Sequence, residues 1–146
     1  MVKMVTVTSL LSIFMISGCA GLNGMLAQEP VKACTAVDES VMKDNLPGHW
    51  SSNGRERVQR DEGVYYYKDG TAKIVSYHPN VGRYTAETKW SISDCYLDEV
   101  VVSSSSKLIR PGLRVRTRLE SVGLSEMVER NDDGKRQIKT RVGTLD

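Results

Sequence analysis

The stretch Val64-Tyr65-Tyr66-Tyr67-Lys68-Asp69-Gly70-Thr71 carries the clearest fold signal in the chain. Its first half is aromatic and β-branched and predicts a strand over residues 64–67. Lys68-Asp69-Gly70 is a turn signal, and a second strand is predicted over residues 71–77. Two such runs around Asp-Gly are a strong short-range signal for a β-hairpin.

Short β-like segments separated by turn residues continue on both sides of this hairpin, without a convincing long helix. Leu113 to Val122 alternates most cleanly, and one face of this segment is expected to be buried and the other solvated. The first strand begins near Trp50, and further strands are expected over residues 84–92, 96–103, 107–110, 124–130 and 136–142. This spacing predicts an all-β fold: an antiparallel meander of about eight strands that curls into a small barrel or a two-sheet sandwich.

The segment that precedes the strands has a different composition. Ala20 to about Lys32 shows no sustained period and includes Pro30, which is typical of a flexible tether. Asp38 to Leu46 is expected to form one short helical turn, with Asp38 as its N-cap and Pro47 ending it.

Three motifs follow one another along the expected strands: Leu46-Pro47-Gly48-His49-Trp50, Tyr66-x-x-Asp69-Gly70-Thr71, and Trp90-x-Ile92 followed by Tyr96-Leu97. Their order and spacing resemble the small lipocalin-like (calycin-type) domains of bacteria, over roughly Leu46 to Val142. The structural positions that this resemblance marks are Gly48, Trp50, Asp69, Gly70 and Trp90. It also implies that Trp50 packs across the closed end of the barrel, beneath a basic residue from a late strand, either Arg130 or Arg141.

The N-terminus has the features of a targeting signal. Lys3 precedes an uncharged, mostly apolar run from Met4 to Ile16, which is well short of the roughly 20 residues that a membrane-spanning helix needs. Ile16-Ser17-Gly18-Cys19 then resembles the lipobox of bacterial lipoproteins. The resemblance implies cleavage after Gly18 and a lipid on the Cys19 sulfur; an ordinary signal peptide, or an N-terminal helix with a buried cysteine, is the alternative.

The expected organisation follows from this lipobox. Residues 1–18 form the signal peptide, 19–45 the lipidated N-terminus with its tether and helical turn, and 46–146 the barrel domain. A stable anchor needs two or more acyl chains. In Gram-negative lipoproteins an aspartate after the cysteine retains the protein at the inner membrane, and this chain has Ala20. A cell-envelope location is expected, with the protein lipid-anchored to the outer membrane on its periplasmic face if the cell is Gram-negative.

Charge and cysteine content exclude some functions. Removing residues 1–18 takes one basic residue and no acidic residue from a formal net charge of +2, so nothing argues for a nucleic-acid partner. Cys34 and Cys95 remain once Cys19 carries lipid, and an even remainder in an exported protein suggests a disulfide, with two unpaired thiols as the alternative. The absence of a C-x-x-C motif argues against a thiol-redox enzyme.

The sequence offers no catalytic constellation. His49 and His78 lack metal-ligand spacing, so no metal is expected; His49 is interpreted as a solvated neighbour of Trp50 and His78 as a turn residue. The acidic pairs Asp61-Glu62, Asp98-Glu99 and Asp132-Asp133 are interpreted as solvated charge, because neighbours in a strand point to opposite faces. A non-catalytic protein without a cofactor is therefore predicted.

Two groups of side chains are candidates for a binding surface. Tyr65 and Tyr67 belong to the tyrosine-rich hairpin, and Arg114, Arg116 and Arg118 form a basic stripe on one strand face. Packing of the tyrosines and simple solvation of the arginines are the alternatives. The predicted function is that of a lipid-anchored binding module for a small apolar ligand or an envelope protein. An inhibitor of lysozyme-type enzymes and an accessory subunit of an envelope or secretion assembly are the alternative functions.

Overall fold

The computed structural model of the chain describes residues 30, 32–52 and 61–145. The predicted signal peptide, Cys19 and most of the predicted tether lie outside the described residues. The chain divides into two compact units, Met1–Pro30 and Val31–Asp146, and the second holds every helix and strand that the structure describes. Within the described ranges, no helix is both long enough and apolar enough to cross a membrane.

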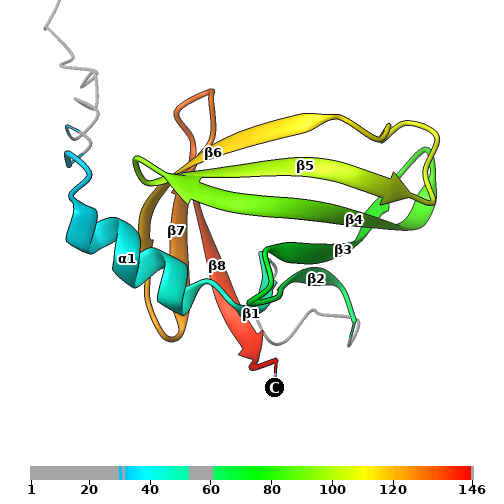
Figure 1. The fold of residues 1–146 in the computed structure, drawn as a ribbon. Coiled ribbons are helices and arrows are strands. Elements are labelled where there is room, and N and C mark those ends of the chain that lie inside the picture. Colours follow the sequence, from blue (N-terminus) through cyan, green and yellow to red (C-terminus); the bar gives the residue numbers. More distant parts are fainter. Residues whose placement is uncertain (1–29, 31, 53–60, 146) are drawn as a thin grey trace, which may run out of the picture. The chain divides into compact units, whose positions relative to one another are not determined.

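Eight antiparallel strands close into a barrel in sequence order (Figure 1). They are β1 (Gly48–Ser51), β2 (Gly63–Tyr66), β3 (Thr71–His78), β4 (Gly82–Ser93), β5 (Tyr96–Ser104), β6 (Arg114–Val122), β7 (Glu126–Arg130) and β8 (Arg136–Gly143). β1 pairs with both β2 and β8, so the sheet has no unpaired edge strand. The prediction of an all-β meander is confirmed, and of the two expected architectures the barrel is the one formed.

The turn between β2 and β3 forms as the Asp-Gly signal predicts. Asp69 Oδ1 accepts hydrogen bonds from the Thr71 amide at 2.9 Å and from the Thr71 hydroxyl at 2.6 Å. Gly70 has φ +84°, a conformation that residues with a Cβ rarely adopt. The side chain of Asp69 and the freedom of Gly70 therefore set the hairpin register locally.

The predicted strand over residues 107–110 is wrong, because this segment is part of the loop between β5 and β6. The Val101 carbonyl accepts from the Gly112 amide at 2.8 Å, and the Ser106 hydroxyl accepts from the Leu108 amide at 3.2 Å. Leu108 is exposed. Local turn bonds and Pro111 leave this segment no neighbouring strand with which to pair.

The helix α1 (Ala36–Asn45) is longer than the predicted turn and has a different cap. Thr35 is the N-cap, and its hydroxyl accepts from the Asp38 amide at 3.1 Å while Asp38 accepts in return from the Thr35 amide at 3.1 Å. This reciprocal pair is a capping box, so the prediction of Asp38 as N-cap is wrong. The hydrogen bond from Thr35 is also the main reason why the pKa of Asp38 is lowered.

Only part of the predicted face of β6 is buried. Leu119 is 1 % exposed, whereas Leu113 and Val115 are 47 % and 46 % exposed. The register with β7 shifts between Leu119 and Ser121. The prediction of one buried face along the whole segment is therefore wrong for its N-terminal half, which lies beyond the packed core.

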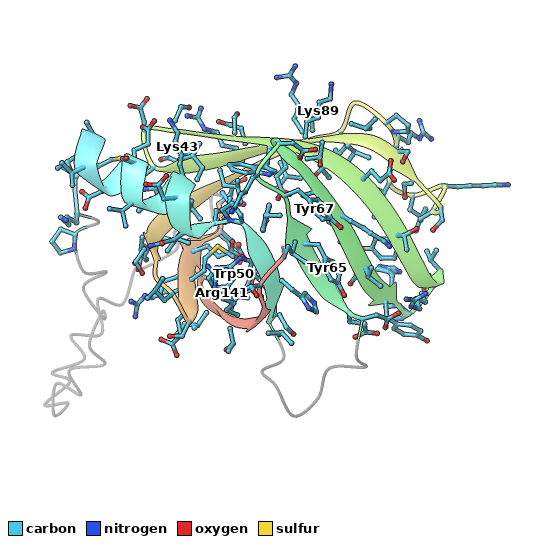
Figure 2. The ribbon with its side chains drawn as sticks, turned by 60° about the horizontal axis from the view of Figure 1, so that its bottom comes forward. Lys43, Trp50, Tyr65, Tyr67, Lys89 and Arg141 are labelled. Carbon is cyan, nitrogen blue, oxygen red and sulfur yellow. A yellow bond between two sulfur atoms is a disulfide. The ribbon has the colours of Figure 1, made fainter. Side chains whose placement is uncertain are left out.

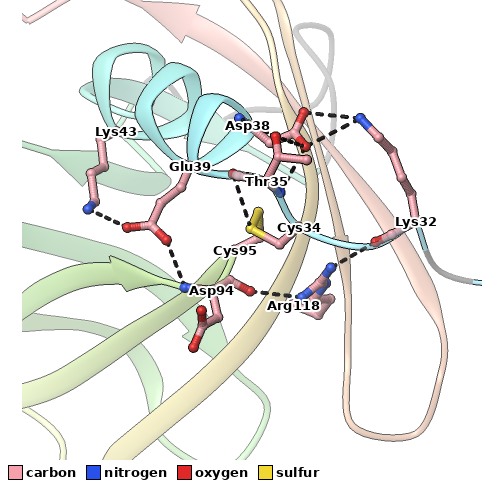
Figure 3. Close-up of a disulfide and its surroundings, with 9 residues drawn as sticks. All are labelled: Lys32, Cys34, Thr35, Asp38, Glu39, Lys43, Asp94, Cys95 and Arg118. Carbon is pink, nitrogen blue, oxygen red and sulfur yellow. Dashed lines mark hydrogen bonds and ion pairs between the residues drawn. A yellow bond between two sulfur atoms is a disulfide. The ribbon is translucent and has the colours of Figure 1, made fainter.

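The predicted disulfide between Cys34 and Cys95 is confirmed, with 5.7 Å between the Cα atoms (Figure 3). It joins the segment before α1 to the turn between β4 and β5. The amide of Asp94, in that turn, donates to Glu39 of α1 at 2.9 Å, and the Asp94 carbonyl accepts from Arg118 at 2.8 Å. The disulfide, the helix and the turn thus form one connected unit.

Removing this disulfide should destabilise the protein. The bond spans a sequence separation of 61, and the chain-entropy cost of closing such a loop makes the oxidised protein more stable by up to about 4 kcal/mol. Urea unfolding of the Cys34→Ala/Cys95→Ala variant should show this loss. Adding a reductant should lower the stability of the parent protein to the same level and leave the double variant unchanged; equal stability of parent and variant would contradict the prediction.

Candidate functional site

Trp50 seals one end of the barrel interior. Its side chain is fully buried, and the indole nitrogen donates to the Leu46 carbonyl at 2.7 Å. The guanidinium of Arg141, on β8, lies 4.3 Å from the centre of the indole ring (Figure 2). Of the two late-strand candidates, Arg141 therefore covers Trp50, while Arg130 is paired with Glu120 at 2.5 Å.

Arg141 also connects three separate segments around Trp50. Its Nη1 donates to the Pro47 carbonyl at 2.6 Å, its Nε to the Leu124 carbonyl at 2.6 Å, and its Nη2 to the Asn45 carbonyl. A Cβ at Gly48 would collide with Nη1, so this predicted structural position requires glycine. Burial lowers the pKa of Arg141. This end of the barrel is structural and is closed by side chains.

The other predicted structural position on a middle strand, Trp90, supports the first hairpin. Its indole nitrogen donates to the Thr71 carbonyl at 2.9 Å and to the Tyr67 carbonyl at 3.1 Å. Its ring meets that of Tyr66 edge to face, with 6.1 Å between centres. Trp90 thus holds the ends of β2 and β3 against β4.

A polar cluster lies inside the barrel, formed by one side chain from each of five strands. Its members are Tyr66 (β2), Thr88 (β4), Glu99 (β5), Glu129 (β7) and Lys139 (β8). Lys139 Nζ lies 2.5 Å from Glu129 Oε1, and the Thr88 hydroxyl donates to Glu99 Oε1 at 3.3 Å. The charge of Lys139 and the nearby Tyr66 hydroxyl also lower the pKa of the Glu99 carboxyl. Because β5 pairs with neither β2 nor β8, these interactions cross the barrel interior.

The cluster is largely removed from solvent. Tyr66 is 0 % exposed, Thr88 is also buried, Glu129 is 3 % exposed, and the Lys139 side chain is 14 % exposed. The Tyr66 hydroxyl has no hydrogen-bond partner among the described residues. Burial, and then the charges of Glu99 and Glu129, raise the pKa of Tyr66 well above its ordinary value. Tyr66 therefore presents a neutral hydroxyl that lies near Glu99 without a hydrogen bond of normal geometry.

Glu99 is the member of the cluster without a cation of its own. Lys139 forms its ion pair with Glu129, whereas Glu99 accepts a hydrogen bond from the neutral Thr88 hydroxyl. Burial raises the pKa of Glu99, and the charge of Lys139 and the hydrogen bond from Thr88 only partly oppose this shift. The cluster can therefore form hydrogen bonds with a bound molecule and balance its charge.

The interior reaches solvent beside Glu99. Val115 of β6 pairs with Glu99 in the sheet register, so the two side chains lie on the same face of the sheet. Val115 is nevertheless 46 % exposed, and Glu99 itself is only partly covered. Solvent therefore reaches this part of the β5–β6 face, where Val115 and Glu99 lie side by side.

The sequence did not lead to a prediction of this cluster, although the alternation of side chains along β5 contains a sign of it. Asp98 points outward and lies 3.5 Å from Arg116, as the prediction of solvated charge requires, but that prediction is wrong for Glu99. Glu99 has the same parity as Leu97 and Val101, both of which are buried. A carboxyl group at a position that the alternation assigns to the core was the sign of this cluster in the sequence.

The tyrosine-rich hairpin is partly packed. Tyr65 stacks on His49 with 4.0 Å between ring centres, and its hydroxyl donates to the Asp61 carbonyl. His49 is buried and its Nε2 lies 2.9 Å from the Glu62 carbonyl oxygen, so the prediction of a solvated His49 is wrong. Tyr67 remains exposed (Figure 2).

The basic stripe on β6 is largely engaged with the protein itself. The guanidinium groups of Arg116 and Arg118 lie 4.4 and 5.1 Å from the centre of the Tyr96 ring. Arg118 also donates to the carbonyls of Asp94 and Lys32. Arg114 is exposed. The structure thus gives two of these arginines a packing role.

The remaining predictions concern metal binding and His78. In the part of the chain that the structure describes, no three His, Cys, Asp or Glu side chains are grouped to hold a metal ion. His78 is the last residue of β3, and its Nδ1 accepts from the Asn80 amide at 3.2 Å in the turn that follows.

Among solved structures, a lipocalin-like protein from Bacteroides uniformis ATCC 8492 is similar to this chain. The sequence identity is 18 %, the alignment covers 66 % of this chain and 98 % of that one, and the TM-score is 0.47. No protein-family model matches the chain, and neither does any curated protein.

The Glu99→Gln variant should change how stability depends on pH. Because the pKa of Glu99 is raised in the folded state, the native protein holds more protons than the unfolded chain between pH 4.5 and the folded pKa, so the free energy of unfolding falls as pH rises through this window. Glutamine has no carboxyl group to titrate, so the Glu99→Gln variant does not lose stability in this way. Urea unfolding at about pH 4 and pH 7 should therefore show the variant gaining on the parent at the higher pH; Glu126→Gln, at an exposed position, should show no such gain.

Proposed function

We propose that this protein is a membrane-tethered binding module that holds a small amphipathic molecule in its barrel. The observation that carries the proposal is the fully buried Tyr66 hydroxyl, which has no hydrogen bond and lies in a charged cluster. Glu99 of this cluster is partly exposed beside Val115, where the ligand would enter. A buried hydroxyl without a hydrogen bond costs about 1–3 kcal/mol, which a ligand that supplies the bond recovers. The sequence predicted a small apolar or amphipathic ligand, and the charged lining favours the second, a ligand that carries a polar group on an apolar body.

The apolar part of the ligand has a surface to contact at the same opening. Leu113 and Val115 are both exposed at the N-terminal end of β6. Thr117 follows on the same side of the strand, deeper in the barrel and partly buried. An entering molecule would therefore place its alkyl part against Leu113 and Val115 and its polar end against the cluster. Small-molecule sites combine an apolar lining with a few placed polar groups in this manner.

The binding proposal is tested by blocking the opening. Val115→Trp places a large ring at the mouth without altering the cluster, and Val102→Trp is a matched control because Val102 is 47 % exposed and follows the inward-facing Val101. Calorimetric titration with six-carbon probes bearing an ammonium, carboxylate or hydroxyl group should detect binding by the parent and by Val102→Trp. Val115→Trp should lose this binding while unfolding at the same temperature. Failure of all three probes to bind the parent would refute the proposal.

The tether in this proposal is the lipid on Cys19. Its support is the charged N-terminus, the apolar run and the match of Ile16-Ser17-Gly18-Cys19 to the lipobox pattern. Several acyl chains on one residue make detachment from a bilayer rare. With Ala20 after the cysteine, the outer membrane is the proposed destination in a Gram-negative cell, with the barrel on the periplasmic side.

Replacing Cys19 should abolish this tethering. In cells fed a radiolabelled fatty acid, Cys19→Ser should lose the label and move from the membrane pellet to the soluble fraction, or remain unprocessed. Ser17→Ala keeps a small residue in the lipobox and should be labelled and processed like the parent. A Cys19→Ser protein that is still acylated and membrane-bound would exclude the lipoprotein assignment.

A further inference from the structure

The balance of charge inside the barrel is uneven. The cluster contains two carboxyl groups, those of Glu99 and Glu129, and one ammonium group, that of Lys139. Lys139 is committed to Glu129 at 2.5 Å. With both carboxyl groups ionised, the cluster has a net negative charge that no side chain within it neutralises. A partly buried carboxylate in this position is costly unless a cation accompanies it.

We propose that the barrel selects ligands that carry a protonated amine, with Glu99 as the ion-pair partner and the Tyr66 hydroxyl as an additional acceptor. This inference rests on the proposed binding function and names the chemical class of its ligand. An alkylammonium group has several N–H donors, and Glu99 and Tyr66 together offer acceptors for them. The alkyl part would extend past Val115 toward solvent.

The same residues disfavour an anionic ligand. Its carboxylate would approach two acidic side chains, and the single ammonium in the cluster is already bonded. A neutral alcohol could bond to Tyr66 but would leave the carboxylate of Glu99 without a cation. A hydrogen bond to a charged group contributes about 1.5–3 kcal/mol, so the amine should bind at least about tenfold more tightly than either analogue of equal chain length.

Binding of an amine should depend on pH through Glu99. The groups that face Glu99 are Tyr66 from β2, Thr88 from β4, Glu129 from β7 and Lys139 from β8, and Val115 from β6 adds no charge. An ion pair with the ligand needs Glu99 as a carboxylate. Wherever Glu99 is protonated in the free protein, binding must release that proton, and the affinity should rise with pH as long as the amine stays protonated.

The test uses the full chain carrying Cys19→Ser, so that no lipid competes for the site. n-Hexylammonium, n-hexanoate and n-hexanol are titrated by calorimetry into this protein and into Glu99→Gln and Asp98→Asn. The last two substitutions remove the same charge from adjacent residues, inside and outside the barrel. We expect hexylammonium to bind most tightly, Glu99→Gln to weaken it about tenfold or more, and Asp98→Asn to leave it unchanged.

Two further measurements separate this inference from general loss of structure. Tyr66→Phe keeps the ring in the core and should weaken both hexylammonium and hexanol, because both can bond to the Tyr66 hydroxyl, whereas Glu99→Gln should weaken hexylammonium alone. Titrations of hexylammonium in buffers of different ionisation enthalpy should report proton release that is absent in Glu99→Gln. If hexanoate or hexanol binds as tightly as hexylammonium, the amine inference is refuted while the binding function stands; if none of the three binds, both fail.

Discussion

Replacing Arg141 with alanine should lower the free energy of unfolding by about 2–4 kcal/mol, because a hydrogen bond from a charged group contributes about 1.5–3 kcal/mol and several such bonds would be lost together. Three carbonyl groups, those of Asn45, Pro47 and Leu124, would lose a charged donor at once. The indole of Trp50 would also lose the guanidinium that covers it at 4.3 Å. The end of α1, the start of β1 and the turn between β6 and β7 would no longer be joined.

The measurement is urea unfolding followed by tryptophan fluorescence, since Trp50 is fully buried in the folded state. Arg136→Ala is the matched control: the residue is on the same strand, but its side chain is 58 % exposed and it pairs with Glu120 at the surface, so its loss should cost no more than about 1 kcal/mol. Arg141→Lys should restore little, because an ammonium cannot bond to three carbonyls in the fork geometry. Similar stabilities of Arg141→Ala and Arg136→Ala would contradict this role.

Replacing Lys139 with methionine should cost a comparable amount, about 3–5 kcal/mol, because the carboxylate of Glu129 would stay buried without its cation. Glu129 is 3 % exposed and its Oε1 lies 2.5 Å from Lys139 Nζ. Methionine keeps most of the aliphatic volume, so the loss measures the uncompensated charge more than a cavity. Urea unfolding near neutral pH provides the measurement.

A second substitution separates charge from packing. In the Lys139→Met/Glu129→Gln variant the buried charge of Glu129 is absent, and most of the lost stability should return. Lys135→Met is the control, since the Lys135 side chain is 82 % exposed and its pairing with Asp133 at 3.7 Å is superficial. If the double variant is no more stable than Lys139→Met, the buried ion pair does not explain the effect.

The strand pattern was predictable because it depends on neighbours in the sequence. The Asp69-Gly70 turn sets its hairpin through bonds that span two residues, and the alternation in the other segments shows which side chains share a face. The predictions that were wrong concern segments whose structure depends on packing against residues distant in the sequence. Residues 107–110 have a strand-like composition but no strand beside them, and Leu113 and Val115 alternate correctly yet remain exposed.

The end of the barrel that Trp50 closes was partly predictable from the sequence, and the polar cluster was not. The lipocalin-like resemblance implied a basic residue over Trp50 and left two candidates, of which the barrel register selects Arg141 by pairing it with Trp50. The sequence indicates solvated charge for Asp98 and Glu99 alike. Its burial depends on Tyr66, Glu129 and Lys139, which reach it from strands that are distant in sequence.

By itself, the sequence determined the β-hairpins and the all-β class and favoured the pairing of Cys34 with Cys95, because turns, alternation and cysteine parity are local or countable properties. The place of Trp50 at the barrel end was implied by the lipocalin-like resemblance. Only the tertiary structure decided the contents of the barrel. Alternation states that a side chain points inward, but closure of β8 onto β1 decides which inward side chains meet. That closure brings Glu99, Glu129 and Lys139 together and leaves the hydroxyl of Tyr66 without a partner.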